Sequence, residues 1–105
     1  QQLIAACNTR NPDQVVAYYT PNAVHITAAR TIQGHAAIRS WYQALFTGLL
    51  PEGAFTHTGF SGSGNSRHFT WTATSSLGSV LNGNDTLGLS NGKITYHYSF
   101  FTITR

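Results

Sequence analysis

The sequence is poor in charge and in cysteine, and each shortage excludes a class of function. Only 9% of its 105 residues are charged, with six Lys and Arg against three Asp and Glu. The basic residues lie singly along the chain, whereas nucleic-acid binding usually needs them clustered on one face, so we expect no nucleic-acid partner. The one cysteine, Cys7, excludes an intrachain disulfide and a cysteine-rich zinc site. Its apolar neighbours favour a small core residue, and a nucleophile is the alternative.

Long apolar runs are also missing. No run approaches the roughly 20 residues that a membrane-spanning helix needs, so we expect no membrane partner. We favour the cytoplasm as the compartment, although low charge with much Ser, Thr, Asn and Gly is also typical of secreted proteins. The length of 105 residues and the 41% of hydrophobic residues suit one folded domain that spans residues 1–105.

Helical signals fill the first part of the chain. Apolar residues recur at helical spacing over residues 1–8, which we expect to be the end of a first helix that begins further upstream. A second helix starts where Asn11 can cap, Pro12 fits the first turn and Asp13 favours the positive end of the helix dipole. This helix is expected to run through Tyr19.

A short strand and a third helix come next. Residues 23–27 alternate like a strand in which His25 lies on the face opposite the apolar residues. His25 is either a pocket acid or base or a surface residue, and the pattern leaves both open. Residues 35–47 predict the third helix, with Trp41 and Tyr42 on its apolar stripe. Core packing is the simpler role for these two side chains, and lining a pocket is the other.

The second half of the chain is extended in character. It is β-branched and aromatic, with clusters of Gly, Ser and Asn between the apolar stretches. We expect strands over residues 55–60, 67–75, 79–89 and 93–104. Helices that precede an antiparallel sheet, with no linker or repeat between them, predict one α+β domain.

Short motifs recur in a particular order along this framework. Three of them are NPD at residues 11–13, VVAYYTPNAV at 15–24 and GHAAIRSWY at 34–42. The fourth is Asp85 in a predicted strand that is followed by NGKI at residues 91–94. In this order they resemble the nuclear-transport-factor-2-like (NTF2-like) superfamily, also called SnoaL-like, to which ketosteroid isomerase belongs. The resemblance implies a cystatin-like α+β cone, with N-terminal helices packed in a curved antiparallel sheet around an apolar pocket.

The superfamily includes ketosteroid isomerase, scytalone dehydratase, limonene epoxide hydrolase, polyketide cyclases and non-enzymatic binders, so the fold does not settle the function. Of the three working groups of ketosteroid isomerase, the resemblance carries over only the oxyanion-hole carboxyl, at Asp85. Its tyrosine position matches Leu3 and its base position matches Thr27, and neither side chain can do that proton chemistry. Tyr42 matches a tyrosine further back in the pocket.

The partner of Asp85 depends on the register of the last hairpin. A two-residue turn at Asn91-Gly92 places Asp85 opposite Tyr98, whereas a three-residue loop over residues 90–92 places it opposite His97. We favour the second register, because the resemblance turns alternate residues of the last strand toward the cone interior: Thr95, His97, Ser99 and Phe101. The other residues of that strand then form an apolar stripe on the outer face, which predicts a homodimer interface through Ile94, Tyr96, Tyr98 and Phe100.

Asp85 and His97 are therefore the candidate catalytic residues. A carboxylate orients a neighbouring imidazole, and such a pair can move protons to and from a bound organic molecule. The alternative is structural, since buried polar groups need partners whether or not they catalyse.

Five further side chains are the predicted ligand contacts: His25, Trp41, Tyr42, Trp71 and Phe101. Their flat apolar surfaces suit a small hydrophobic, ring-containing molecule. The remaining histidines, His35, His57 and His68, show no paired spacing with carboxylates or cysteine, so we expect no metal site and no cofactor.

These features leave three functions open. The first is a cofactor-free acid–base enzyme of isomerase, cyclase, dehydratase or epoxide hydrolase type. The second is a non-catalytic binder of such a molecule, which needs only the aromatic pocket. The third is a dimeric scaffold that has kept the fold and needs only the outer stripe.

Overall fold

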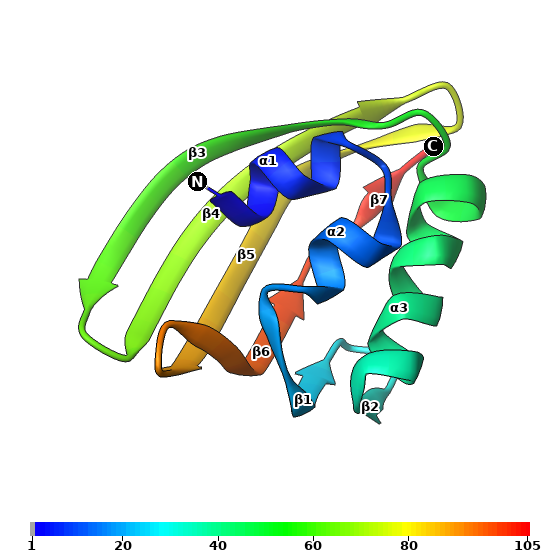
Figure 1. Ribbon diagram of the computed structural model, residues 1–105. Coiled ribbons are helices and arrows are strands. Elements are labelled where there is room, and N and C mark those ends of the chain that lie inside the picture. The colour runs from blue at the N-terminus through cyan, green and yellow to red at the C-terminus, as the bar shows by residue number, and fades with distance from the viewer. Residues whose placement is uncertain (1) are drawn as a thin grey trace.

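The computed structural model describes residues 2–105 (Figure 1). Its helices are α1 (Gln2–Asn8), α2 (Pro12–Val16) and α3 (His35–Ala44), and α3 continues into a π-helical turn, η1 (Leu45–Leu49). Its strands are β1 (Tyr19–Ile26), β2 (Thr31–Gln33), β3 (Ala54–Ser63), β4 (Ser66–Ser75), β5 (Gly78–Ser90), β6 (Lys93–Phe100) and β7 (Ile103–Thr104). The predicted α+β class is confirmed. Within residues 2–105 no helix is long and apolar enough to cross a membrane.

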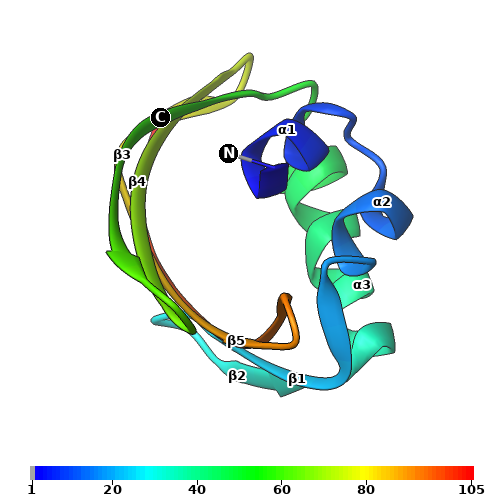
Figure 2. The same ribbon diagram turned by 60° about the vertical axis from the view of Figure 1, so that its left-hand side comes forward.

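One curved sheet carries the architecture. Its strand order is β2-β1-β6-β5-β4-β3, with β1 parallel to β6, the other neighbours antiparallel, and β7 paired with β5. Figure 2 shows the sheet curling round α1, while α2 and α3 close the side that it leaves open. The core lies between the concave face and these helices, where Val15, Ile38 and Val80 have no exposed surface.

The start of α2 forms as its sequence predicts. The Asn11 side chain accepts a hydrogen bond of 3.0 Å from the Asp13 backbone N–H, and Pro12 occupies the first turn. On the surface Arg39 donates to the Asp13 carboxylate at 2.6 Å, and this hydrogen bond lowers the pKa of Asp13. Asp13 therefore has a structural role.

The predicted length of α2 is wrong. The helix ends at Val16, and Tyr19 begins β1 by pairing with Ile94 of β6. Pairing with a distant strand outweighs the local helical pattern of this short segment. Pro21 lies where the register of β1 on β6 is interrupted, which suits a residue that cannot donate to a sheet ladder.

The hairpin between β5 and β6 closes through two residues. Ser90 pairs with Lys93, and Asn91 and Gly92 have φ angles of 52° and 79°, as a type I′ turn requires. The favoured three-residue loop is therefore wrong, and the two-residue alternative describes the turn.

A β-bulge then changes the register within β6. Leu89 pairs with Ile94 but Gly88 pairs with Tyr96, so Thr95 is the extra residue on β6, the bulged strand. Such an insertion shifts every later pair by one residue.

The bulge decides which side chains face the interior. Asp85 pairs with Ser99, a partner that neither predicted register gave it. His97 and Ser99 are buried, as the favoured register expected. The favoured register was wrong for Ile94 and Thr95. Ile94 is buried at 5% exposure and Thr95 is exposed, because the extra residue interrupts the alternation of inward and outward side chains between them and His97.

Candidate functional site

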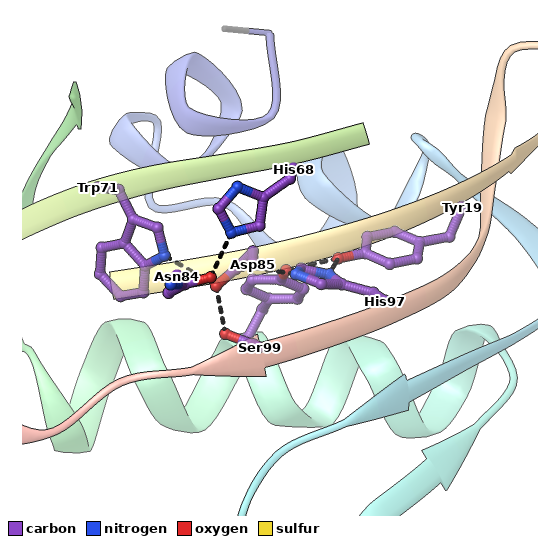
Figure 3. A network of polar contacts seen from close by, with 8 residues as sticks. Tyr19, His68, Trp71, Asn84, Asp85, His97 and Ser99 are labelled. Atoms are coloured by element: carbon purple, nitrogen blue, oxygen red, sulfur yellow. Dashed lines mark hydrogen bonds and ion pairs between the residues drawn. The ribbon is translucent and has the colours of Figure 1, made fainter. Parts of the chain in front are cut away.

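A buried carboxylate forms the centre of the site. Asp85, on β5, is 4% exposed and accepts three hydrogen bonds from the two strands beside it (Figure 3). Trp71 Nε1 and Ser99 Oγ each lie 2.9 Å from Oδ1, and His97 Nε2 lies 2.6 Å from Oδ2. Because an indole N–H can only donate, the carboxylate oxygen is the acceptor in that contact.

The hydrogen bonds continue beyond the imidazole. His97 Nδ1 lies 2.7 Å from the Tyr19 hydroxyl, which lies 2.6 Å from the Tyr42 hydroxyl. One arrangement that satisfies all of these contacts has Tyr42 donating to Tyr19, Tyr19 donating to Nδ1, and Nε2–H donating to Asp85. The result is a continuous chain of hydrogen bonds between α3 and β5.

Burial fixes the protonation of both phenols. Removal from water raises the pKa of Tyr19 and of Tyr42 well above the ordinary value for tyrosine. For Tyr42 the neighbouring Tyr19 raises the pKa further. Both hydroxyls are therefore neutral donors.

Tyr19 was not predicted as a site residue. Its assignment to a helix gave no reason to direct its side chain toward Asp85, and only the pairing of β1 with β6 brings the two ends of the chain together. The available signal was a tyrosine followed directly by Thr20 and Pro21, and it is a weak one.

His25 lies on the inner face of β1, which excludes the surface position that its sequence pattern left open. It is 1% exposed, and its ring centroid lies 4.6 Å from that of His97. Burial, with a smaller effect from His97, lowers the pKa of His25 to about 3, so its ring is neutral at ordinary pH. Within residues 2–105 no hydrogen-bond partner reaches its Nδ1.

A cavity joins these side chains. Its volume is about 30 Å³, and its lining includes Asp85, His97 and Ser99 together with all the predicted ligand contacts: His25, Trp41, Tyr42, Trp71 and Phe101. A water needs about 10–15 Å³, whereas small-molecule pockets usually measure about 300–1,000 Å³. The cavity has room for one or two waters, and a pocket for a ring-containing ligand stays a prediction.

Cys7 also lines this cavity, as a buried and inert group. Burial, assisted by the Asp85 charge, raises the pKa of its thiol to about 12, so it stays protonated. In the part of the chain that the structure describes, no group of three His, Cys, Asp or Glu side chains is placed to hold a metal ion.

The comparisons with known proteins agree with this architecture. The sequence model of the SnoaL-like domain matches residues 1–97. The chain belongs to the SnoaL-like domain family. No curated protein matches the chain at a significant level.

Solved structures of the SnoaL-like and NTF2-like group share the fold. A candidate isomerase of the SnoaL-like family from Agrobacterium tumefaciens str. C58 is 25% identical, with 97% of this chain and 92% of that chain covered and a TM-score of 0.79. A candidate ketosteroid isomerase from Kribbella flavida DSM 17836 is 16% identical, with coverages of 96% and 73% and a TM-score of 0.81. SalBIII, an epoxide hydrolase/cyclase-like enzyme with a role in pyran ring formation in the polyether salinomycin, is 21% identical, with coverages of 95% and 84% and a TM-score of 0.80.

Proposed function

We propose that this SnoaL-like protein is a cofactor-free acid–base enzyme acting on a small hydrophobic, ring-containing molecule. The observation that carries the proposal is the buried chain Tyr42–Tyr19–His97–Asp85, of which three members line one cavity. The candidate reactions are those of the isomerase, cyclase, dehydratase and epoxide hydrolase types, and the similarity to a candidate isomerase and to an epoxide hydrolase/cyclase-like enzyme supports this range.

The carboxylate has the capacity for proton transfer. Its two oxygens offer about four acceptor positions, and Trp71, His97 and Ser99 occupy three of them. The fourth is available to a proton from a bound molecule. His97 and the two tyrosines behind it would then adjust their hydrogen bonds to the changed charge on Asp85.

Asp85→Asn tests this role. The amide oxygen can still accept from Trp71 and Ser99, and the amide N–H can donate to His97 once that ring takes its other tautomer, so the fold is expected to survive. Purified protein would be incubated with a panel of neutral cyclic ketones, epoxides and alcohols, and products would be measured by mass spectrometry. Loss of the proton-transfer group should lower turnover by about 10²–10⁴-fold.

The matched control is Asp13→Asn, because Asp13 is an exposed carboxylate paired with Arg39 on the surface. It should leave turnover unchanged. Full activity in Asp85→Asn would contradict the assignment.

A second candidate is a non-catalytic binder. The observation that favours it is that both nitrogens of His97 are already engaged by protein partners, so this pair can serve structure alone. The same two variants separate the candidates. A binder predicts no turnover in any variant of the panel and ligand affinity that changes little in Asp85→Asn.

A further inference from the structure

The cavity beside Asp85 has a larger neighbour. A groove of about 340 Å³ lies beside it, lined by Thr27, Ala28, Ala29, Trp41, Ser99, Phe101, Thr102 and Ile103. The cavity and the groove share Trp41, Ser99 and Phe101. The groove therefore has the size that a ring-containing ligand needs, while the cavity holds the polar groups.

Phe101 is the side chain best placed to divide the two spaces. Its ring centroid lies 5.5 Å from that of Trp71 inside the cavity and 6.2 Å from that of Trp41. Of the two shared aromatic residues, Trp41 belongs to α3, whereas Phe101 lies between the end of β6 at Phe100 and the start of β7 at Ile103.

The backbone just after Phe101 is held by Asn82, and the Phe101 side chain lies at the edge of the groove. The Thr102 backbone N–H donates to Asn82 Oδ1 at 2.9 Å, and Asn82 Nδ2 donates to Thr102 Oγ1 at 3.3 Å. Phe101 itself is half-buried and borders the open groove. A change of its rotamer needs no rearrangement of the sheet.

The charge of the lining restricts the ligand. Among the described residues that line the cavity and the groove there is no Lys or Arg, and the one Asp or Glu is Asp85. An anion placed there would meet no compensating charge in a largely apolar setting. The shared space therefore suits an uncharged molecule.

From these observations we propose that Phe101 is a specificity-determining residue, whose side chain separates the Asp85 cavity from the outer groove and moves aside for a neutral ring-containing ligand. The proposal rests on the proposed function for the class of ligand. The ring system would occupy the groove, and its polar atom would reach past Ser99 toward Asp85.

Intrinsic fluorescence provides the assay, because the chain has only two tryptophans, Trp41 and Trp71, and both line the cavity. The probe is 2-naphthol, which is neutral at pH 7, and its association rate is measured by stopped-flow quenching. The rate should rise severalfold along the series wild type, Phe101→Leu, Phe101→Val, Phe101→Ala, in which no variant adds a tryptophan. If the alanine variant does not fold, as judged by circular dichroism, the other three members still give the trend.

Two control variants test whether 2-naphthol reaches the cavity past Phe101 or by another path. Phe100→Ala removes an exposed phenylalanine on the outer face, at the adjacent position. Leu49→Ala enlarges a different groove, of about 380 Å³, which shares only Trp41 with the cavity. Both should associate with 2-naphthol at the wild-type rate.

Three results would overturn the proposal: equal rates across the Phe101 series, the same increase in Leu49→Ala, or binding of the anion 2-naphthoate as tightly as 2-naphthol. Absence of 2-naphthol binding in every variant would overturn it as well. The assay needs no turnover, so a correct binding series with an inactive enzyme would contradict the proposed function alone.

Discussion

At the scale of single residues, the Asp85 carboxylate is held in place from two sides. Trp71 reaches it from β4, and His97 and Ser99 reach it from β6. Loss of any one donor leaves two in place, so the position of the carboxylate does not depend on a single contact. A proton-transfer group needs such fixed geometry, and so does a structural polar cluster.

The neutral ring of His25 should make stability depend on pH. Its unfolded pKa is 6.5 and its folded pKa is about 3, so between these values the unfolded chain binds a proton that the folded protein does not. Its contribution to the free energy of unfolding is therefore complete above pH 6.5 and falls by about 1.4 kcal/mol per pH unit below it. His25→Phe should remove this slope, as measured by urea unfolding between pH 7 and pH 4.

Other groups titrate over the same range, so the test is the difference between the two proteins. The groups packed on His25 are His97, Tyr19 and Tyr42, and all of them remain in the variant. His68→Phe, on the outer face, should keep the wild-type slope. Parallel curves for wild type and His25→Phe would refute the expectation.

At the scale of elements, the β4–β5 pair depends on a glycine. Gly83 lies opposite Trp71, and a Cβ at this position would come within 2.3 Å of the indole ring. The missing side chain lets the indole lie flat across β5, with Nε1 directed at Asp85. Trp71 can hold the carboxylate only because its neighbour has no side chain.

Gly83→Ala should therefore displace the Trp71 ring and weaken its hydrogen bond to Asp85. Overpacking of this kind costs about 1–3 kcal/mol of stability. Chemical denaturation measures the cost, and a change in tryptophan fluorescence reports the displaced ring. Gly48→Ala is the control, because nothing lies within 4 Å of its Cβ position; equal losses in the two variants would be inconsistent with this role of Gly83.

At the scale of the whole molecule, the outer face of the sheet remains apolar near β6. Tyr96, Tyr98 and Phe100 are 41%, 39% and 46% exposed, whereas Ile94, the fourth member of the predicted stripe, is buried. We still expect a homodimer through the remaining three side chains, because exposed aromatic residues in a row favour association.

Tyr98→Glu should convert this dimer to a monomer, since a charge buried at an apolar interface is unfavourable. Analytical ultracentrifugation measures the mass of each species. Leu77→Glu is the matched control, because Leu77 is 52% exposed in the turn between β4 and β5 and lies away from the stripe. A wild-type protein that stays monomeric at high concentration would rule the interface out.

Much of the fold was accessible from the sequence, because its signals act over a few residues. The Asn11 cap, the apolar spacing of α3 and the alternation of β4 each depend on near neighbours, and the structure has these elements where they were predicted. The inward direction of His97 came from the family resemblance and is correct.

What determined the site in detail was contact between segments far apart in the chain. The extra residue Thr95 reset the register, Tyr19 joined the hydrogen-bond chain through pairing of β1 with β6, and Asp85 received Ser99 as its cross-strand partner. The sequence by itself determined which residues could form a polar centre within an apolar cone. Only the tertiary structure decided their partners and the volume of about 30 Å³ left between them, because bulges and cavities result from packing whole elements together.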